Sequence, residues 1–111
     1  MEKIKPQFPR IPDKKYFRIG EVSEITGTEA YVLRFWQKEF KGINPKRTES
    51  GQRLYQKADI ELILKIKYLL HEKNFTIKGA KRYLKETEAL NAYELLEEIR
   101  KELLHIRDIL N

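Results

Sequence analysis

The chain has 111 residues, enough for one domain and one accessory element, which excludes a large catalytic or ligand-binding domain. It carries 23 Lys and Arg against 17 Asp and Glu, a net charge of +6, and the absence of cysteine excludes disulfides and thiolate metal sites. The charge is uneven: residues 1–85 hold 20 basic and 10 acidic side chains, and residues 86–111 hold 3 and 7. A surface that binds a polyanion is therefore expected in the first three quarters of the chain.

The first fourteen residues are predicted to form a flexible basic arm. They contain Pro6, Pro9 and Pro12, a spacing that opposes a helix and favours extended backbone. The arm has no apolar stretch long enough for a signal peptide, and the most apolar run of the chain is interrupted by Lys65 and Lys67. Neither export nor a membrane span is predicted, and a cytoplasmic location is expected.

Two short helices are predicted after the arm. Ile19, Val22 and Ile25 recur at helical spacing and stop at Gly27, the residue type that ends helices in a left-handed conformation. Thr28 follows and offers a hydroxyl to cap the start of a second helix. Two short helices joined across one glycine indicate a helix-turn-helix.

A β-hairpin is predicted directly after the second helix. Basic segments flank the loop Glu49–Gly51, whose glycine suits the positive φ of a tight turn. Because side chains alternate along a strand, Arg53 and Tyr55 share one face, which is predicted to point outward, and Leu54 is predicted to fix the hairpin to the body. A hairpin appended to a helix-turn-helix is a wing, and Arg and Tyr on its outer face offer hydrogen-bond donors to phosphate.

Three motifs follow one another between about residues 16 and 86: FRIGEVSEITG, YVLRFW and NPKRTESGQRLYQKADIELI. In this order they make the sequence resemble the MerR family of transcription regulators over roughly two thirds of the chain. The resemblance implies a recognition helix after the turn. It also implies a wing in which Gly51, Arg53 and Tyr55 contact the DNA backbone.

The resemblance further assigns the middle of the second helix. The family has an Arg followed by two aromatic residues at the positions of Arg34, Phe35 and Trp36. By resemblance, Arg34 and one of the two rings are expected to lie near phosphate. The family often has two tyrosines here, so two phenol donors are absent from this chain. Gln52 likewise replaces the aromatic common between the Gly and Arg of the wing. The alternative, from helical spacing alone, is that Phe35, Trp36 and Phe40 belong to the core.

The C-terminal segment carries a heptad pattern. Its apolar residues alternate at spacings of three and four, and the predicted dimerisation residues are Leu96, Ile99, Leu103, Ile106 and Leu110. One helix cannot bury such a stripe alone, so a homodimer is expected, and the resemblance implies an antiparallel pairing. The alternative is a helix that folds back on its own domain.

The predicted fold is mainly α: a winged helix-turn-helix with a small β-hairpin wing and a C-terminal coiled-coil helix. Its parts are the flexible arm at 1–14, a DNA-binding domain at 15–87 and the dimerisation helix at 88–111. The residues expected to face base edges, at the start of the recognition helix, are Thr28, Glu29, Tyr31 and Val32. The other predicted DNA-binding residues are Arg18, Arg34, Phe35, Trp36, Lys46, Arg47, Arg53 and Tyr55.

The predicted function is sequence-specific binding of a homodimer to an inverted repeat in double-stranded DNA at a promoter, with RNA polymerase as a further partner. No enzyme, cofactor or metal site is predicted, because His71 and His105 are isolated and no glycine cluster could hold a nucleotide phosphate. One alternative is an architectural or excisionase-like protein that bends DNA with weak sequence preference. The other is a coiled-coil interaction adaptor whose basic domain binds an acidic protein.

Overall fold

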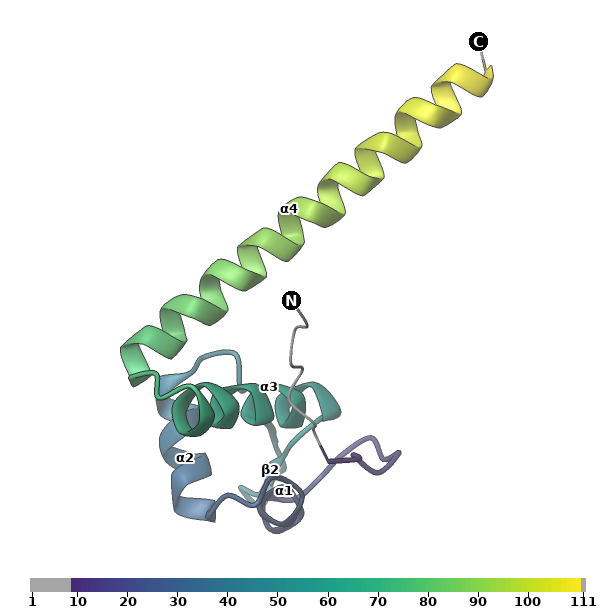
Figure 1. Cartoon of the computed structure of the whole chain (residues 1–111). Coiled ribbons are helices and arrows are strands. Elements are labelled where there is room, and N and C mark those ends of the chain that lie inside the picture. The colour runs from purple at the N-terminus through teal and green to yellow at the C-terminus, as the bar shows by residue number, and fades with distance from the viewer. Residues whose placement is uncertain (1–8, 111) are drawn as a thin grey trace. The chain divides into compact units, whose positions relative to one another are not determined.

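The computed structural model describes residues 9–110, apart from the side chains at 91–93, 95 and 102–110. The chain divides into two units, of which the first ends at Ile77 and the second begins at Lys78. The elements, shown in Figure 1, are α1 (Ile19–Thr26), α2 (Ala30–Glu39), β1 (Lys46–Arg47), β2 (Arg53–Leu54), α3 (Lys57–Lys67), the π-helical turn η1 (Tyr68–Glu72) and α4 (Ile77–Leu110). The prediction of a mainly helical winged helix-turn-helix is confirmed.

The helix-turn-helix forms because α1 ends where the sequence permits a left-handed residue. Gly27 has φ 63°, and Val22 and Leu33 are buried where α1 and α2 pack. The predicted N-cap is one residue early: the N-cap position of α2 is Glu29, whose side chain makes no cap hydrogen bond. Thr28 is buried, and its Oγ1 donates to the carbonyl of Thr26 at 3.3 Å. The hydroxyl of Thr28 therefore stabilises the turn and not the start of α2.

A lysine of α3 completes the end of α1. Lys67 Nζ donates to the carbonyl oxygen of Thr26 at 2.7 Å, and an added Cβ at Gly27 would lie 3.1 Å from that nitrogen. A cation at the C-terminus of a helix stabilises its unpaired carbonyls and its dipole. The ammonium group therefore ties α3 to the turn of the helix-turn-helix.

The wing is a two-stranded antiparallel hairpin. Lys46 lies opposite Leu54 and Arg47 opposite Arg53, and Gly51 in the loop has φ 85°. The strand continues by one bridge beyond the hairpin: Phe17 and Tyr55 exchange two backbone hydrogen bonds of 2.8 Å. The segment before α1 is therefore joined to the wing.

Several core residues of the first unit come from α3. Ile60, Ile63 and Ile66 are fully buried. Asp59 is also buried, and each of its two carboxylate oxygens accepts a hydrogen bond. One oxygen accepts from the backbone N–H of Gln56 at 2.8 Å and caps α3; the other accepts from the N–H of Asn44 at 3.0 Å. Asp59 thus fixes the loop between α2 and β1 to the start of α3.

Replacing Asp59 by Ala is expected to lower the free energy of unfolding by about 2 kcal/mol, because the N–H groups of Asn44 and Gln56 lose their buried acceptor. Asp59→Asn keeps one carbonyl acceptor and is expected to cost about half as much. Urea unfolding of both variants measures the difference. A loss below about 0.5 kcal/mol for Asp59→Ala would show that the two contacts contribute little.

The second unit consists of α4, which is continuous across the boundary drawn at residue 87 from the sequence. Arg82 pairs with Glu86 at 3.1 Å, and Arg100 lies 3.9 Å from Glu97, both along the helix surface. Among the described residues no helix is long and apolar enough to cross a bilayer.

Candidate nucleic-acid interface

Tyr55 of the wing is fully buried, so the outward orientation predicted for its phenol is wrong. Arg53 and Tyr55 do share a strand face, as alternation requires, but that face turns toward the body of the first unit. The Tyr55 hydroxyl donates to Oε1 of Gln37 on α2 at 3.3 Å. Burying a large ring gains more than burying Leu54, which stays half-buried. Tyr55 and not Leu54 therefore holds the wing to the body.

The Tyr55 hydroxyl lies within electrostatic range of three arginines and of Asp59. Burial raises the pKa of Tyr55, and the positive charges of Arg53, Arg34 and Arg47 act in the opposite direction. These three residues, here called the arginine cluster, come from α2 and from both strands of the wing. Within the described part of the chain none of them forms an ion pair with a carboxylate. A concentration of unpaired guanidinium groups is a site for an anion.

Arg53 contributes an additional unused donor. Its Nε is buried and has no hydrogen-bond partner in the structure. A buried donor without a partner is costly, and a bound anion is one way to satisfy it. Lys46, at the base of β1, is exposed and lies over the ring of Tyr16, with Nζ 5.7 Å from the ring centre and 3.5 Å from the hydroxyl.

The exposed face formed by α2 and the turn before it differs from the predicted one at two positions. Trp36 is only 3% exposed and Thr28 is buried, so neither side chain lies on the exposed face. Phe35, for which a core position was the alternative, is 49% exposed, and Tyr31 is 69% exposed as expected. These two rings lie with Arg34 and Lys38 on the exposed surface of α2. Two other residues that were predicted to face base edges also contact solvent: Glu29 is exposed and Val32 is half-buried.

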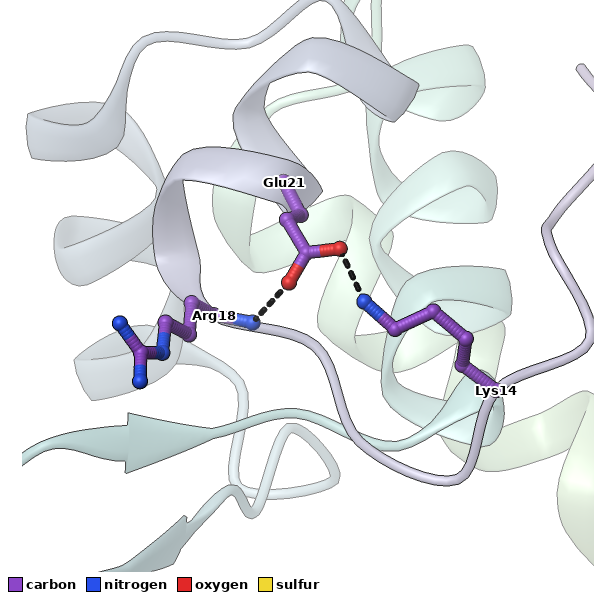
Figure 2. Close-up of polar contacts among 3 residues, drawn as sticks. All are labelled: Lys14, Arg18 and Glu21. Atoms are coloured by element: carbon purple, nitrogen blue, oxygen red, sulfur yellow. Dashed lines mark hydrogen bonds and ion pairs between the residues drawn. The ribbon is translucent and has the colours of Figure 1, made fainter.

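The start of α1 provides another cation. Figure 2 shows that the carboxylate of Glu21 accepts from the backbone N–H of Arg18, at 3.3 Å, and pairs with the ammonium of Lys14. The Arg18 guanidinium points away from both groups in this view. Glu21 therefore caps the helix without neutralising the Arg18 side chain, which stays exposed. Sequence reasoning missed this arrangement, although a Glu three residues after the cap is its signal.

The Lys14 ammonium and the Arg18 N–H hold the pKa of Glu21 below its ordinary value. The folded state therefore gains stability from the ionised carboxylate above the ordinary pKa, and loses it as pH falls through the lowered pKa. We expect Glu21→Gln to be less stable than the wild type at pH 7 and equally stable at strongly acidic pH. Urea unfolding at several pH values measures this, and a stability difference that is the same at every pH would contradict it.

The geometry thus defines a winged helix-turn-helix protein whose recognition helix and wing present unpaired arginines. A family model described as MerR HTH family regulatory protein matches residues 17–87. That match covers more than half of the chain, so the chain belongs to the MerR family of helix-turn-helix regulatory proteins, as the sequence motifs predicted.

Several HTH-type transcriptional regulators are similar in sequence to this chain. GlnR of Bacillus anthracis, an HTH-type transcriptional regulator, is 33% identical over 89 residues, which cover 77% of this chain and 67% of that protein. TnrA of Bacillus subtilis (strain 168) is 43% identical over 54 residues, or 49% of this chain and 48% of that protein. MlrA of Escherichia coli (strain K12) is 39% identical over 51 residues, or 46% of this chain. The chain matches less than half of TnrA and 21% of MlrA.

Among solved structures, the chain is similar to HiNmlR, a MerR family regulator lacking the sensor domain, whose crystal structure was determined with promoter DNA bound. The TM-score is 0.56 at 23% sequence identity, over 86% of this chain and 78% of that one. This likeness shows the shared fold.

Proposed function

We propose that the protein is a sequence-specific regulator of transcription that binds double-stranded DNA through its first unit. The observation that carries the proposal is the arginine cluster, three guanidinium groups without carboxylate partners in the described residues, at the junction of recognition helix and wing. Fork-shaped guanidinium groups bind phosphate oxygens in pairs. The names of the relatives as transcriptional regulators, and the promoter DNA bound to HiNmlR, support the same function.

The contacts divide into two kinds. The arginine cluster, with Arg18 and Lys46, supplies phosphate contacts that set the register of the protein on the duplex. The exposed surface of α2, with Tyr31 and Phe35, lies against the base edges, together with Glu29 and Val32 near its start. Buried Trp36 and Thr28 act through the fold and make no direct contact in this proposal.

The second unit makes the protein a dimer. Leu96 is 65% and Ile99 45% exposed on α4, and an isolated helix cannot bury such side chains itself. The predicted seam continues through Leu103, Ile106 and Leu110, whose side chains lie outside the described residues. A second copy that pairs along this seam, in the antiparallel sense that the family resemblance implies, would place two recognition helices on an inverted repeat. Binding to DNA at a promoter also gives the protein a cytoplasmic location and RNA polymerase as a neighbour.

Selection of duplexes from a randomised pool at moderate salt, followed by sequencing, tests this proposal. Enrichment of an inverted repeat is the expected result, and the separation of its halves gives the spacing of the two recognition helices. Binding without enrichment would favour a DNA-bending architectural protein. Absence of binding would leave the basic unit as the surface of an adaptor for acidic proteins.

A further inference from the structure

The hydrogen bond between Tyr55 and Gln37 determines which groups remain free at the junction of α2 and the wing. A phenol hydroxyl has one proton, and the Tyr55 hydroxyl donates it to Gln37 Oε1 at 3.3 Å. Its ring is fully buried. While this bond exists, the Tyr55 hydroxyl cannot donate to a phosphate, and a neighbouring group must take that role.

Gln37 is the neighbour with unused donors. Its side-chain oxygen is engaged by Tyr55, whereas its amide nitrogen carries two N–H donors that have no partner among the described residues. The residue is half-buried, and it follows Arg34 by three positions, so the two side chains lie on adjacent turns of the same side of α2. The positive charges of the arginine cluster act on the same Tyr55 hydroxyl that donates to Gln37.

We propose that Gln37 is a DNA-contacting and positioning residue: its oxygen holds the Tyr55 hydroxyl of the wing, and its amide N–H groups donate to a phosphate of the DNA backbone held by the arginine cluster. This inference rests on the proposed function. In this proposal the uncharged hydrogen bond to phosphate comes from Gln37 of α2, because the Tyr55 hydroxyl is not available to make it. The same side chain then fixes the angle of the wing and contributes to the phosphate site.

A phosphate fits this position better than a base edge does. The charged donors near this position are the guanidinium groups of the arginine cluster, including the buried and unpartnered Nε of Arg53. A phosphodiester presents two charged oxygens that accept several hydrogen bonds at once. No carboxylate of the described residues pairs with the cluster and competes for these donors.

Three variants separate the two roles of Gln37. Tyr55→Phe and Gln37→Met both remove the hydrogen bond to the wing, but only Gln37→Met removes the amide donors. Gln37→Glu keeps an acceptor for Tyr55 and replaces the donors by a negative charge. The affinity of each variant for the duplex enriched by the wild type is measured over a range of salt concentrations, and a thermal melt of each variant checks the fold.

We expect Tyr55→Phe to stay within about threefold of the wild-type affinity and Gln37→Met to lose about tenfold. Because the amide is neutral, the loss should be the same at every salt concentration, leaving the slope of log affinity against log salt unchanged. Gln37→Glu should lose more than Gln37→Met, because its carboxylate repels phosphate, although its melting temperature stays near that of the wild type.

Three results would overturn the inference: equal losses for Gln37→Met and Tyr55→Phe, wild-type affinity for Gln37→Glu, or a shallower salt slope for Gln37→Met. Equal losses of affinity would mean that Gln37 acts only by holding the wing. A shallower salt slope for Gln37→Met would mean that Gln37 acts only by positioning the arginines. These outcomes are distinct from failure of the proposed function, in which the wild type itself binds no duplex.

Discussion

Replacing Arg53 by Ala should weaken binding to every duplex by about tenfold to a hundredfold, because each protomer loses a charged two-pronged contact with phosphate. The loss should not depend on sequence, since a phosphate contact carries no base information. In a dimer the slope of log affinity against log salt should become shallower by about 1.8, which corresponds to two fewer phosphate contacts. Equilibrium titration of the variant on matched and scrambled duplexes measures both quantities.

Two further variants serve as controls for Arg53→Ala. Arg53→Lys keeps the positive charge but removes the planar guanidinium group that makes two hydrogen bonds to one phosphate. It should therefore keep the salt slope and lose part of the affinity. Lys65→Ala removes one exposed charge from α3, outside the arginine cluster, and should change affinity little. A slope for Arg53→Ala equal to that of the wild type would remove Arg53 from the phosphate contacts.

The double substitution Leu96→Asp with Ile99→Asp should convert the proposed dimer to a monomer, because two charges per protomer would enter the apolar seam of α4. Affinity for an inverted repeat should then fall by about a hundredfold or more, since the two halves of the site are no longer bound by one linked molecule. Affinity for a single half-site should stay the same. Sedimentation equilibrium gives the mass of the variant, and titration gives the two affinities.

The matched control is Glu98→Lys, which changes a charge at an exposed position of α4 outside the seam. It should remain dimeric and bind the inverted repeat as the wild type does. If Leu96→Asp with Ile99→Asp also remains dimeric, another surface of the protein holds the two copies together.

The turns of this fold could be predicted from sequence because they depend on local backbone conformation. Gly27 and Gly51 both adopt the positive φ that their positions required, Gly27 at the end of α1 and Gly51 in the loop of the wing. The start of α2 was placed one residue early because Thr28 is a good capping residue in isolation. In the structure its hydroxyl is taken by the carbonyl of Thr26 inside the turn.

The candidate site was only partly predictable. Because side chains alternate between the two faces of a strand, the sequence predicts that Arg53 and Tyr55 share a face. The direction of that face depends on the bridge to Phe17 and on packing against α2. These contacts join segments far apart in sequence. Gln37 was missed for a related reason: a glutamine within a helix forms no distinctive motif, and its spacing from Arg34 gains meaning only once Tyr55 is buried against it.

The most direct test of the central claim is the salt dependence of wild-type binding to a duplex with an inverted repeat. If Arg18, Lys46 and the three residues of the arginine cluster each contact one phosphate in both protomers, log affinity should fall linearly with log salt with a slope of about −9. A slope shallower than about −2, or no binding at low salt, would contradict the account, because these cationic groups would then not be contacting phosphates.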